Sequence, residues 1–125
     1  MIKKVGENTI KFTLPPKIAS GYAIVGPKEG LSPLSSYFDY ILKNDAFNEK
    51  TYEKAERKML EQAISGAIDK ANLLSTDIDI LLSGDLLNQI ISASFSARQL
   101  QTSFIGLFGA CSTMTEALAV GACII

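Results

Sequence analysis

The sequence contains no histidine and no tryptophan, and only two cysteines occur among its 125 residues. Two cysteines do not make a disulfide framework, and the lack of histidine excludes a Cys/His zinc site. We therefore expect a reducing, intracellular setting and predict no metal-ligating residues. Catalysis that relies on a histidine acid or base is likewise excluded for these residues.

Neither sign of charge dominates, because the 12 basic residues nearly cancel the 13 acidic ones. No cluster of Lys and Arg is interleaved with aromatic side chains that could stack on bases, so we predict no nucleic-acid partner. The densest charge run, Glu49 to Glu61, mixes both signs along one face of a predicted helix. Such a run is typical of a solvated surface.

Long hydrophobic runs of the kind used for targeting are also missing. Met1 to Phe12 mixes polar and charged residues, so no signal peptide is expected there. The 22 residues from Phe104 to Ile125 contain one charge, but small and polar residues from Gly109 to Glu116 interrupt them. We therefore predict a buried strand followed by a buried helix in this stretch, and no transmembrane helix.

A chain of this length is expected to form one domain or part of one. Hydrophobic residues make up 47% of the sequence and charged residues 20%, which is slightly apolar for a small free-standing domain. The sequence ends on an apolar run, Val120 to Ile125, with no closing cap or polar tail. We expect residues 1–125 to be part of a truncated domain whose apolar surface meets another chain or a missing segment.

The first half of the sequence indicates two short strands, a loop and a helix. β-Branched residues at Ile10 to Leu14 and at Ile18 to Val25 indicate strands, which a pair of prolines separates. Residues 27–48 are rich in Gly, Pro, Ser and aromatics, which is typical of a long ordered loop with about one helical turn. Thr51 can cap a helix, and apolar residues then recur at spacings of three and four through Ala71.

The second half alternates strands and helices. The pattern predicts a strand at Ile78 to Leu82, a helix from about Leu86 to Leu100, a strand at Ser103 to Phe108, and a helix from Cys111 through at least Ala122. Together with the strand and helix before them, these elements imply parallel βαβ units. We therefore predict an α/β fold.

The strongest local signal for chemistry is the cysteine after the last predicted strand. From Phe104 to Thr113 a buried strand turns sharply on small residues and presents Cys111 at a helix start. Helix-terminal amides there favour a thiolate nucleophile, and they equally favour a bound carboxylate. We expect the thiol at the floor of a pocket with Ser112 as a neighbouring ligand contact, although a free cysteine can also be a small core residue.

Asp85 and Asn88 are the other candidate ligand-binding residues. Asp85 follows a predicted parallel strand at its carboxyl end, where ligand-contacting residues of open α/β sheets gather, and Asn88 lies beside it at the start of the next helix. A role for Asp85 as a helix cap is equally compatible with its position. Lys28 and Arg98 could offer positive charge to an anionic ligand, or could be ordinary exposed residues.

The order of these motifs resembles a known superfamily. Leu73 to Asp85, then a helix, then Phe108 to Cys111 resemble the N-terminal half of thiolase-superfamily proteins such as ketoacyl synthases, whose reactive cysteine corresponds to Cys111. Within that superfamily the sequence resembles the stage V sporulation protein AD family. Four strings in matching order and spacing support this along nearly the whole chain: Val25 to Gly30, Ala55 to Met59, Ser83 to Gln89 and Leu107 to Thr113.

The resemblance implies both a fold and a function. The fold would be the N-terminal half of a thiolase-like domain, with a mixed and largely parallel sheet packed by helices. The family is implicated in binding dipicolinic acid, alone or with Ca²⁺, and in moving it into the developing spore beside membrane proteins of the same sporulation operon. A homodimer is also implied, in the cytoplasm at the periphery of the spore inner membrane, without a resident cofactor.

The resemblance leaves a choice between two functions, besides the possibility that these residues are a stable core fragment with neither activity. Because the catalytic histidines of condensing enzymes belong to the second half of the fold, we expect a binding protein rather than a working enzyme. The alternative is an acyl-thioester condensing or transferase enzyme of the ketoacyl synthase III type, with Cys111 as its nucleophile.

Overall fold

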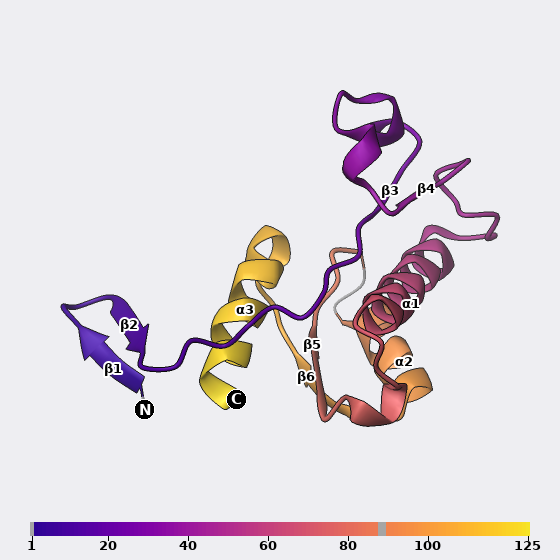
Figure 1. Cartoon of the computed structure of the whole chain (residues 1–125). Helices are drawn as coiled ribbons and strands as arrows, with labels where there is room; N and C mark the ends of the chain where they lie inside the picture. The colour runs from indigo at the N-terminus through magenta and orange to yellow at the C-terminus, as the bar shows by residue number, and fades with distance from the viewer. Residues whose placement is uncertain (1, 88–89) are drawn as a thin grey trace.

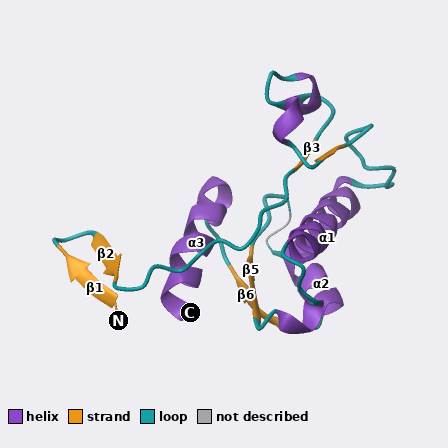
Figure 2. Cartoon of the chain, in the orientation of Figure 1, coloured by secondary structure: helices purple, strands orange, loops and turns teal. Residues whose placement is uncertain are grey.

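The computed structural model describes residues 2–87 and 90–125 (Figure 1). These residues form a mixed α/β fold with three α-helices and three two-stranded sheets (Figure 2), which confirms the predicted class. Two of the sheets, β3–β4 and β5–β6, are parallel, and β1–β2 is antiparallel. The order of elements is β1 (Ile2–Val5), β2 (Thr9–Phe12), β3 (Ile24–Val25), β4 (Tyr40–Ile41), α1 (Tyr52–Lys70), β5 (Ile80–Ser83), α2 (Ile91–Leu100), β6 (Ser103–Gly106) and α3 (Thr113–Ile124).

The β5–α2–β6 unit is the centre of the fold. Its strands pair in parallel from Ile80 opposite Ser103 to Ser83 opposite Gly106, as the alternation of strands and helices predicted. α2 contacts both β6 and α1, while α3 contacts β5. In Figure 1 the two strands lie between α3 on one side and the α1–α2 pair on the other. A parallel pair covered by helices is consistent with the thiolase-like fold that the resemblance implies.

α1 begins at its predicted cap and packs against α2. Thr51 Oγ1 accepts a hydrogen bond from the Lys54 N–H at 3.3 Å, which satisfies one free amide of the first turn. The fully buried residues of both helices are small, and small side chains let helices lie close together. These residues are Ala55 on α1 and Ser92, Ala93, Ser96 and Ala97 on α2.

The apolar C-terminal stretch forms β6, a turn and α3, as predicted. None of the helices in the described ranges is long and apolar enough to span a membrane. The predicted burial of the last helix is wrong for these residues, because α3 has no fully buried side chain. Met114, Leu118 and Ile124 on α3 are 71%, 52% and 49% exposed.

The N-terminal strands differ from the prediction. The strand expected at residues 10–14 is β2, and it pairs with β1, which the mixed polar sequence did not indicate. The strand expected at residues 18–25 retains only β3, because Ser20 before it contacts α1, where its Oγ donates to the Ala67 carbonyl at 2.6 Å. β3 pairs with β4 and not with β5 or β6, so the first implied βαβ unit does not form among the described residues. The β1–β2 hairpin extends away from the other elements (Figure 1).

The long loop at residues 27–48 is ordered by contacts with α1. It contains β4 and two short 3₁₀ turns, one more turn than predicted. Asp39 accepts a hydrogen bond from the Ala23 N–H at 2.8 Å and forms an ion pair with Lys70 Nζ at 2.7 Å. The Lys70 hydrogen bond, and after it the Ala23 hydrogen bond, lowers the pKa of Asp39. The loop and the end of α1 are therefore joined by a charged contact.

Candidate functional site

Two turns meet at the carboxyl ends of β5 and β6, the edge where open parallel sheets gather ligand-contacting residues. The Leu107 N–H donates to the Ser83 carbonyl at 3.0 Å and continues the strand pairing into the turns. Gly84 permits this close approach, because a Cβ there would collide with the Leu107 carbonyl oxygen and would lie 3.0 Å from Thr113 Cγ2. The loop after β5 and the turn after β6 therefore form one continuous region.

The turn after β6 places Cys111 directly before a helix. Cys111 lies in a 3₁₀ turn, Ala110–Ser112, and α3 begins at Thr113, two residues later than predicted. Ala110 has a φ of +46°, a left-handed conformation that costs a non-glycine residue about 1 kcal/mol or more. The Gly109 carbonyl accepts hydrogen bonds from the N–H of Ser112 at 2.8 Å and from its hydroxyl at 2.6 Å, and these bonds hold the turn closed.

Cys111 and Ser112 are exposed to solvent, and Cys111 is a free thiol. Their neighbours Phe108 and Met114 are also exposed, at 78% and 71%. The described residues therefore present the thiol on an open surface. They neither enclose it in the expected pocket nor bury it as a core residue, so a ligand or reagent can reach it.

Asp85 caps helix α2, one of the two roles that its position allowed. Its Oδ1 accepts a hydrogen bond from the Ile90 N–H at 2.8 Å, and its Oδ2 accepts one from the Ala93 N–H at 3.2 Å. Ile90 is 8% exposed and has a φ of +72°, so it cannot be part of the helix, and α2 begins later than the predicted Leu86. Asp85 therefore fixes the loop after β5. Asn88 lies outside the described residues.

Glu56 on α1 supports the same loop, and the sequence reasoning missed it. Its Oε1 accepts hydrogen bonds from the N–H groups of Leu86 and Leu87 at 3.3 and 3.4 Å. Its Oε2 accepts a hydrogen bond from Ser92 Oγ at 2.8 Å. All three partners lie at least 30 residues further along the chain, beyond the reach of helical periodicity. The one available signal was its place in the family string Ala55 to Met59.

Glu116 was also missed, although it packs against the Cys111 turn. It lies in the first turn of α3, and its Oε2 is buried without a hydrogen-bond partner among the described residues. A Cβ at Gly109 would lie 2.5 Å from this oxygen and 2.9 Å from Thr113 N. An unpaired buried acceptor is unfavourable by about 1–3 kcal/mol. The signal was available, because Glu116 is the single charge between Phe104 and Ile125.

The remaining candidates do not add a metal or a cation to this region. Within residues 2–87 and 90–125, no three His, Cys, Asp or Glu side chains are grouped so that they could hold a metal ion. Lys28 is exposed directly before a 3₁₀ turn. Arg98 is exposed in the last turn of α2, at the opposite end of that helix from the Asp85 loop.

Comparison with known proteins identifies the family. The profile of the family described as stage V sporulation protein AD matches residues 6–125. The chain is 42% identical over 124 residues to the stage V sporulation protein AD of Bacillus subtilis (strain 168). This alignment covers 99% of the chain and 37% of the relative, so the chain spans little more than a third of the relative's length. The chain therefore belongs to the stage V sporulation protein AD family, as its four sequence strings implied.

Proposed function

We propose that this chain forms part of a site that binds dipicolinic acid, and that the protein supports uptake of this compound into the developing spore. The observation that carries the proposal is the junction of the turns after β5 and β6, where Cys111 and Ser112 stand exposed before α3. Membership of a sporulation family supports the cellular setting.

Dipicolinic acid is a planar aromatic ring with two carboxylates, and the region offers a counterpart to each feature. The N-terminus of the 12-residue helix α3 favours a carboxylate through its partial positive charge. The Ser112 hydroxyl now donates to the Gly109 carbonyl, and it can rotate and donate to a ligand instead. The Phe108 ring is 78% exposed and can stack on the ligand. In this proposal Asp85 holds the loop, and Asn88 remains a proposed contact.

Isothermal titration calorimetry with dipicolinate tests this proposal. Ser112→Asp adds a negative charge at the start of α3 but keeps a residue type that caps helices well. It should therefore weaken binding at least about tenfold without unfolding the chain. Ser36→Asp adds the same charge in an exposed turn and should bind like the natural sequence. Equal affinities of the two variants would show that the ligand binds elsewhere.

The titrations should be run on two proteins, with and without Ca²⁺. The same pair of substitutions can be made in the longer Bacillus subtilis relative, at its aligned positions. If residues outside the chain complete the site, only the relative will bind, and the aspartate aligned with Ser112 will still weaken that binding. We propose that Ca²⁺ arrives as the dipicolinate chelate. Ca²⁺ added at the same concentration as dipicolinate would then act by forming the chelate, and not by binding to the protein on its own.

An acyl-transfer function is the alternative, and the free, exposed thiol of Cys111 on a strained turn favours it. In that reaction the thiolate attacks the carbonyl of an acyl-CoA, a thioester forms on the Cys111 sulfur, the bond from the acyl carbon to the CoA sulfur breaks, and CoA leaves as its thiolate. Mass spectrometry after incubation with acetyl-CoA distinguishes the two functions. An adduct that Cys111→Ser abolishes and Cys123→Ser retains supports the enzyme. No adduct, together with dipicolinate binding, supports the binding protein.

We also propose that the protein works as a homodimer, at the periphery of the spore inner membrane, beside membrane proteins of the same operon. Among the described residues β6 pairs only with β5, so its other edge is open to a strand from a second copy. Sedimentation equilibrium of the Bacillus subtilis relative tests the dimer. A monomer at micromolar concentration would refute it.

A further inference from the structure

A polar groove runs along α1 and into its contact with α2, separate from the candidate ligand site. It consists of three adjoining hollows with volumes of about 190, 340 and 300 Å³. The hollows share lining residues: Glu61 borders the first and second, Arg57 the second and third, and Gln99 the first and third. We call this surface the α1–α2 groove. It lies toward the C-terminal end of α2, whereas the Asp85 loop lies at the N-terminal end.

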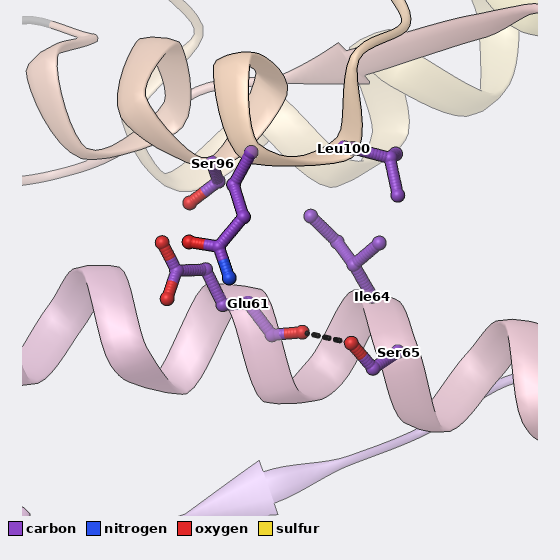
Figure 3. Close-up of a pocket in the computed structure, with 6 residues that line it drawn as sticks. Glu61, Ile64, Ser65, Ser96 and Leu100 are labelled. Atoms are coloured by element: carbon purple, nitrogen blue, oxygen red, sulfur yellow. Dashed lines mark hydrogen bonds between the residues drawn. The ribbon is translucent and has the colours of Figure 1, made fainter. Parts of the chain in front are cut away.

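The floor of the groove is the contact between the two helices. Figure 3 shows Glu61 and Ile64 of α1 projecting toward Ser96 and Leu100 of α2. Ser96 is only 2% exposed and donates its hydroxyl hydrogen bond to the helix backbone. Ser96 and the apolar Ile64 and Leu100 therefore form the base, and the longer polar side chains lie at the rim.

Arg57 is held rigidly at the rim. Its Nε donates to Glu61 Oε1 at 2.6 Å, its Nη2 donates to Gln99 Oε1 at 3.3 Å, and its guanidinium carbon lies 5.1 Å from the centre of the Phe95 ring. A guanidinium has five N–H donors, and within the described residues no bond engages Nη1. The group is therefore oriented in advance and can still bind a carboxylate.

Charge and exposed apolar surface coincide in the groove. Four basic residues and two acidic residues line it, a net charge of +2, whereas the whole chain has a net charge of −1. Arg98 is exposed and forms no ion pair within the described part of the chain. Phe95, one turn before Arg98 on α2, is 46% exposed. Arginine and aromatic residues, phenylalanine among them, are enriched at the cores of protein interfaces.

We propose that the α1–α2 groove binds an acidic segment of a partner protein. Carboxylates of the segment would bind the guanidinium groups of Arg57 and Arg98, and an aromatic or aliphatic side chain of the segment would pack on Phe95. The positive groove favours a negatively charged partner, and the exposed ring favours a peptide over a simple inorganic anion. This proposal does not depend on dipicolinate binding, because the two surfaces share no residue.

Fluorescence anisotropy with the 125-residue chain and a labelled synthetic peptide, four glutamates around one leucine, tests the proposal. Arg98→Glu should weaken binding roughly tenfold. Lys43→Glu makes the same charge change at an exposed position outside the groove and should leave the affinity within about twofold. Equal losses in both variants, or no loss in either, would overturn the proposal. Matching far-UV circular dichroism confirms that both variants are folded.

Two further measurements separate a peptide site from a site for small anions. Phe95→Ser removes an exposed ring without changing charge, and it should weaken the peptide at least about threefold while the salt dependence stays the same. Unchanged affinity would refute the apolar contact. Inorganic phosphate at the ionic strength of a sodium chloride control should displace no more peptide than the chloride does. Greater displacement by phosphate would show a small-anion site and overturn the assignment to a protein partner.

Discussion

Replacing Asp85 by alanine separates the two roles that its position allows. In the structure its carboxylate accepts hydrogen bonds from the N–H of Ile90 at 2.8 Å and from the N–H of Ala93 at 3.2 Å. Ile90 is 8% exposed and Ala93 is fully buried, so water cannot easily replace the carboxylate at either donor. The alanine variant therefore leaves two backbone donors without a partner at the start of α2.

The expected loss follows from these two bonds. A hydrogen bond to a charged group contributes about 1.5–3 kcal/mol, and loss of a helix cap alone costs about 0.5–2 kcal/mol. Because Asp85 is half-buried and some water can reach the loop, we expect a loss of about 2–4 kcal/mol for the alanine variant. Asp85→Asn keeps one acceptor oxygen and should lose about half as much.

Urea unfolding, followed by circular dichroism at the helical band, measures this loss. A change of 2–4 kcal/mol corresponds to a midpoint shift of roughly 1–2 M urea. Asp79→Ala is the matched control, because Asp79 is an exposed aspartate just before β5, and it should change stability by less than about 0.5 kcal/mol. If Asp85→Ala lost less than about 1 kcal/mol and still lost dipicolinate binding, the capping role would be refuted and a direct ligand contact supported.

Three further changes test other parts of the structure. Gly66→Ala should lower the urea midpoint despite the better helix propensity of alanine, because the added methyl would collide with the Tyr22 ring. Asp39 has a lowered pKa in the folded chain, so its ion pair contributes stability above about pH 4. This stability is lost as the pH falls through the folded pKa. Asp39→Asn should therefore reduce the loss of stability that urea titrations measure between pH 6 and pH 3. Gly109→Ala would place a methyl group 2.9 Å from a backbone nitrogen and so must move the turn. Iodoacetamide should then alkylate Cys111 at a changed rate, while the second cysteine of the same molecule reports an unchanged one.

The helices and the central parallel unit could be predicted because their signals are local. Thr51 marks the start of α1, and the spacing of apolar residues through Ala71 predicts the C-terminal end of the helix to within one residue. The runs at residues 78–82 and 103–108 are apolar and bounded by polar turns, and they form β5 and β6. Each of these signals lies within the element that it describes.

The parts that the sequence did not predict depend on contacts between distant residues. β-Branched residues at 18–25 favour a strand, but the Ser20 hydroxyl binds the carbonyl of Ala67 and draws the segment onto α1. α2 starts late because the Asp85 carboxylate reaches forward to Ile90, whose backbone is left-handed. A periodicity of three and four residues contains no information about either contact.

The same division holds for the candidate site. The turn that presents Cys111 was predicted because a strand, small residues and a helix start follow one another in the sequence. Glu56 was missed because it reaches the loop after β5 across at least 30 residues of sequence. Glu116 was missed because the first turn of a helix is an ordinary place for a glutamate, and only the structure places its oxygen against Gly109.

The backbone itself supports the edge of β5 and β6 as the site. Asn72 and Gln101 are left-handed just after α1 and α2, where helices commonly end in this conformation. Ile90 and Ala110 are left-handed as well, and each lies in a strand-to-helix connection at this edge. Phe47 and Asn48, in the loop before α1, are also left-handed. Such residues cost about 1–3 kcal/mol each and persist only where surrounding contacts hold them, as the Asp85 carboxylate does for Ile90. Two strained connections meet at this edge, beside the exposed thiol, and the proposed ligand site is based on this arrangement.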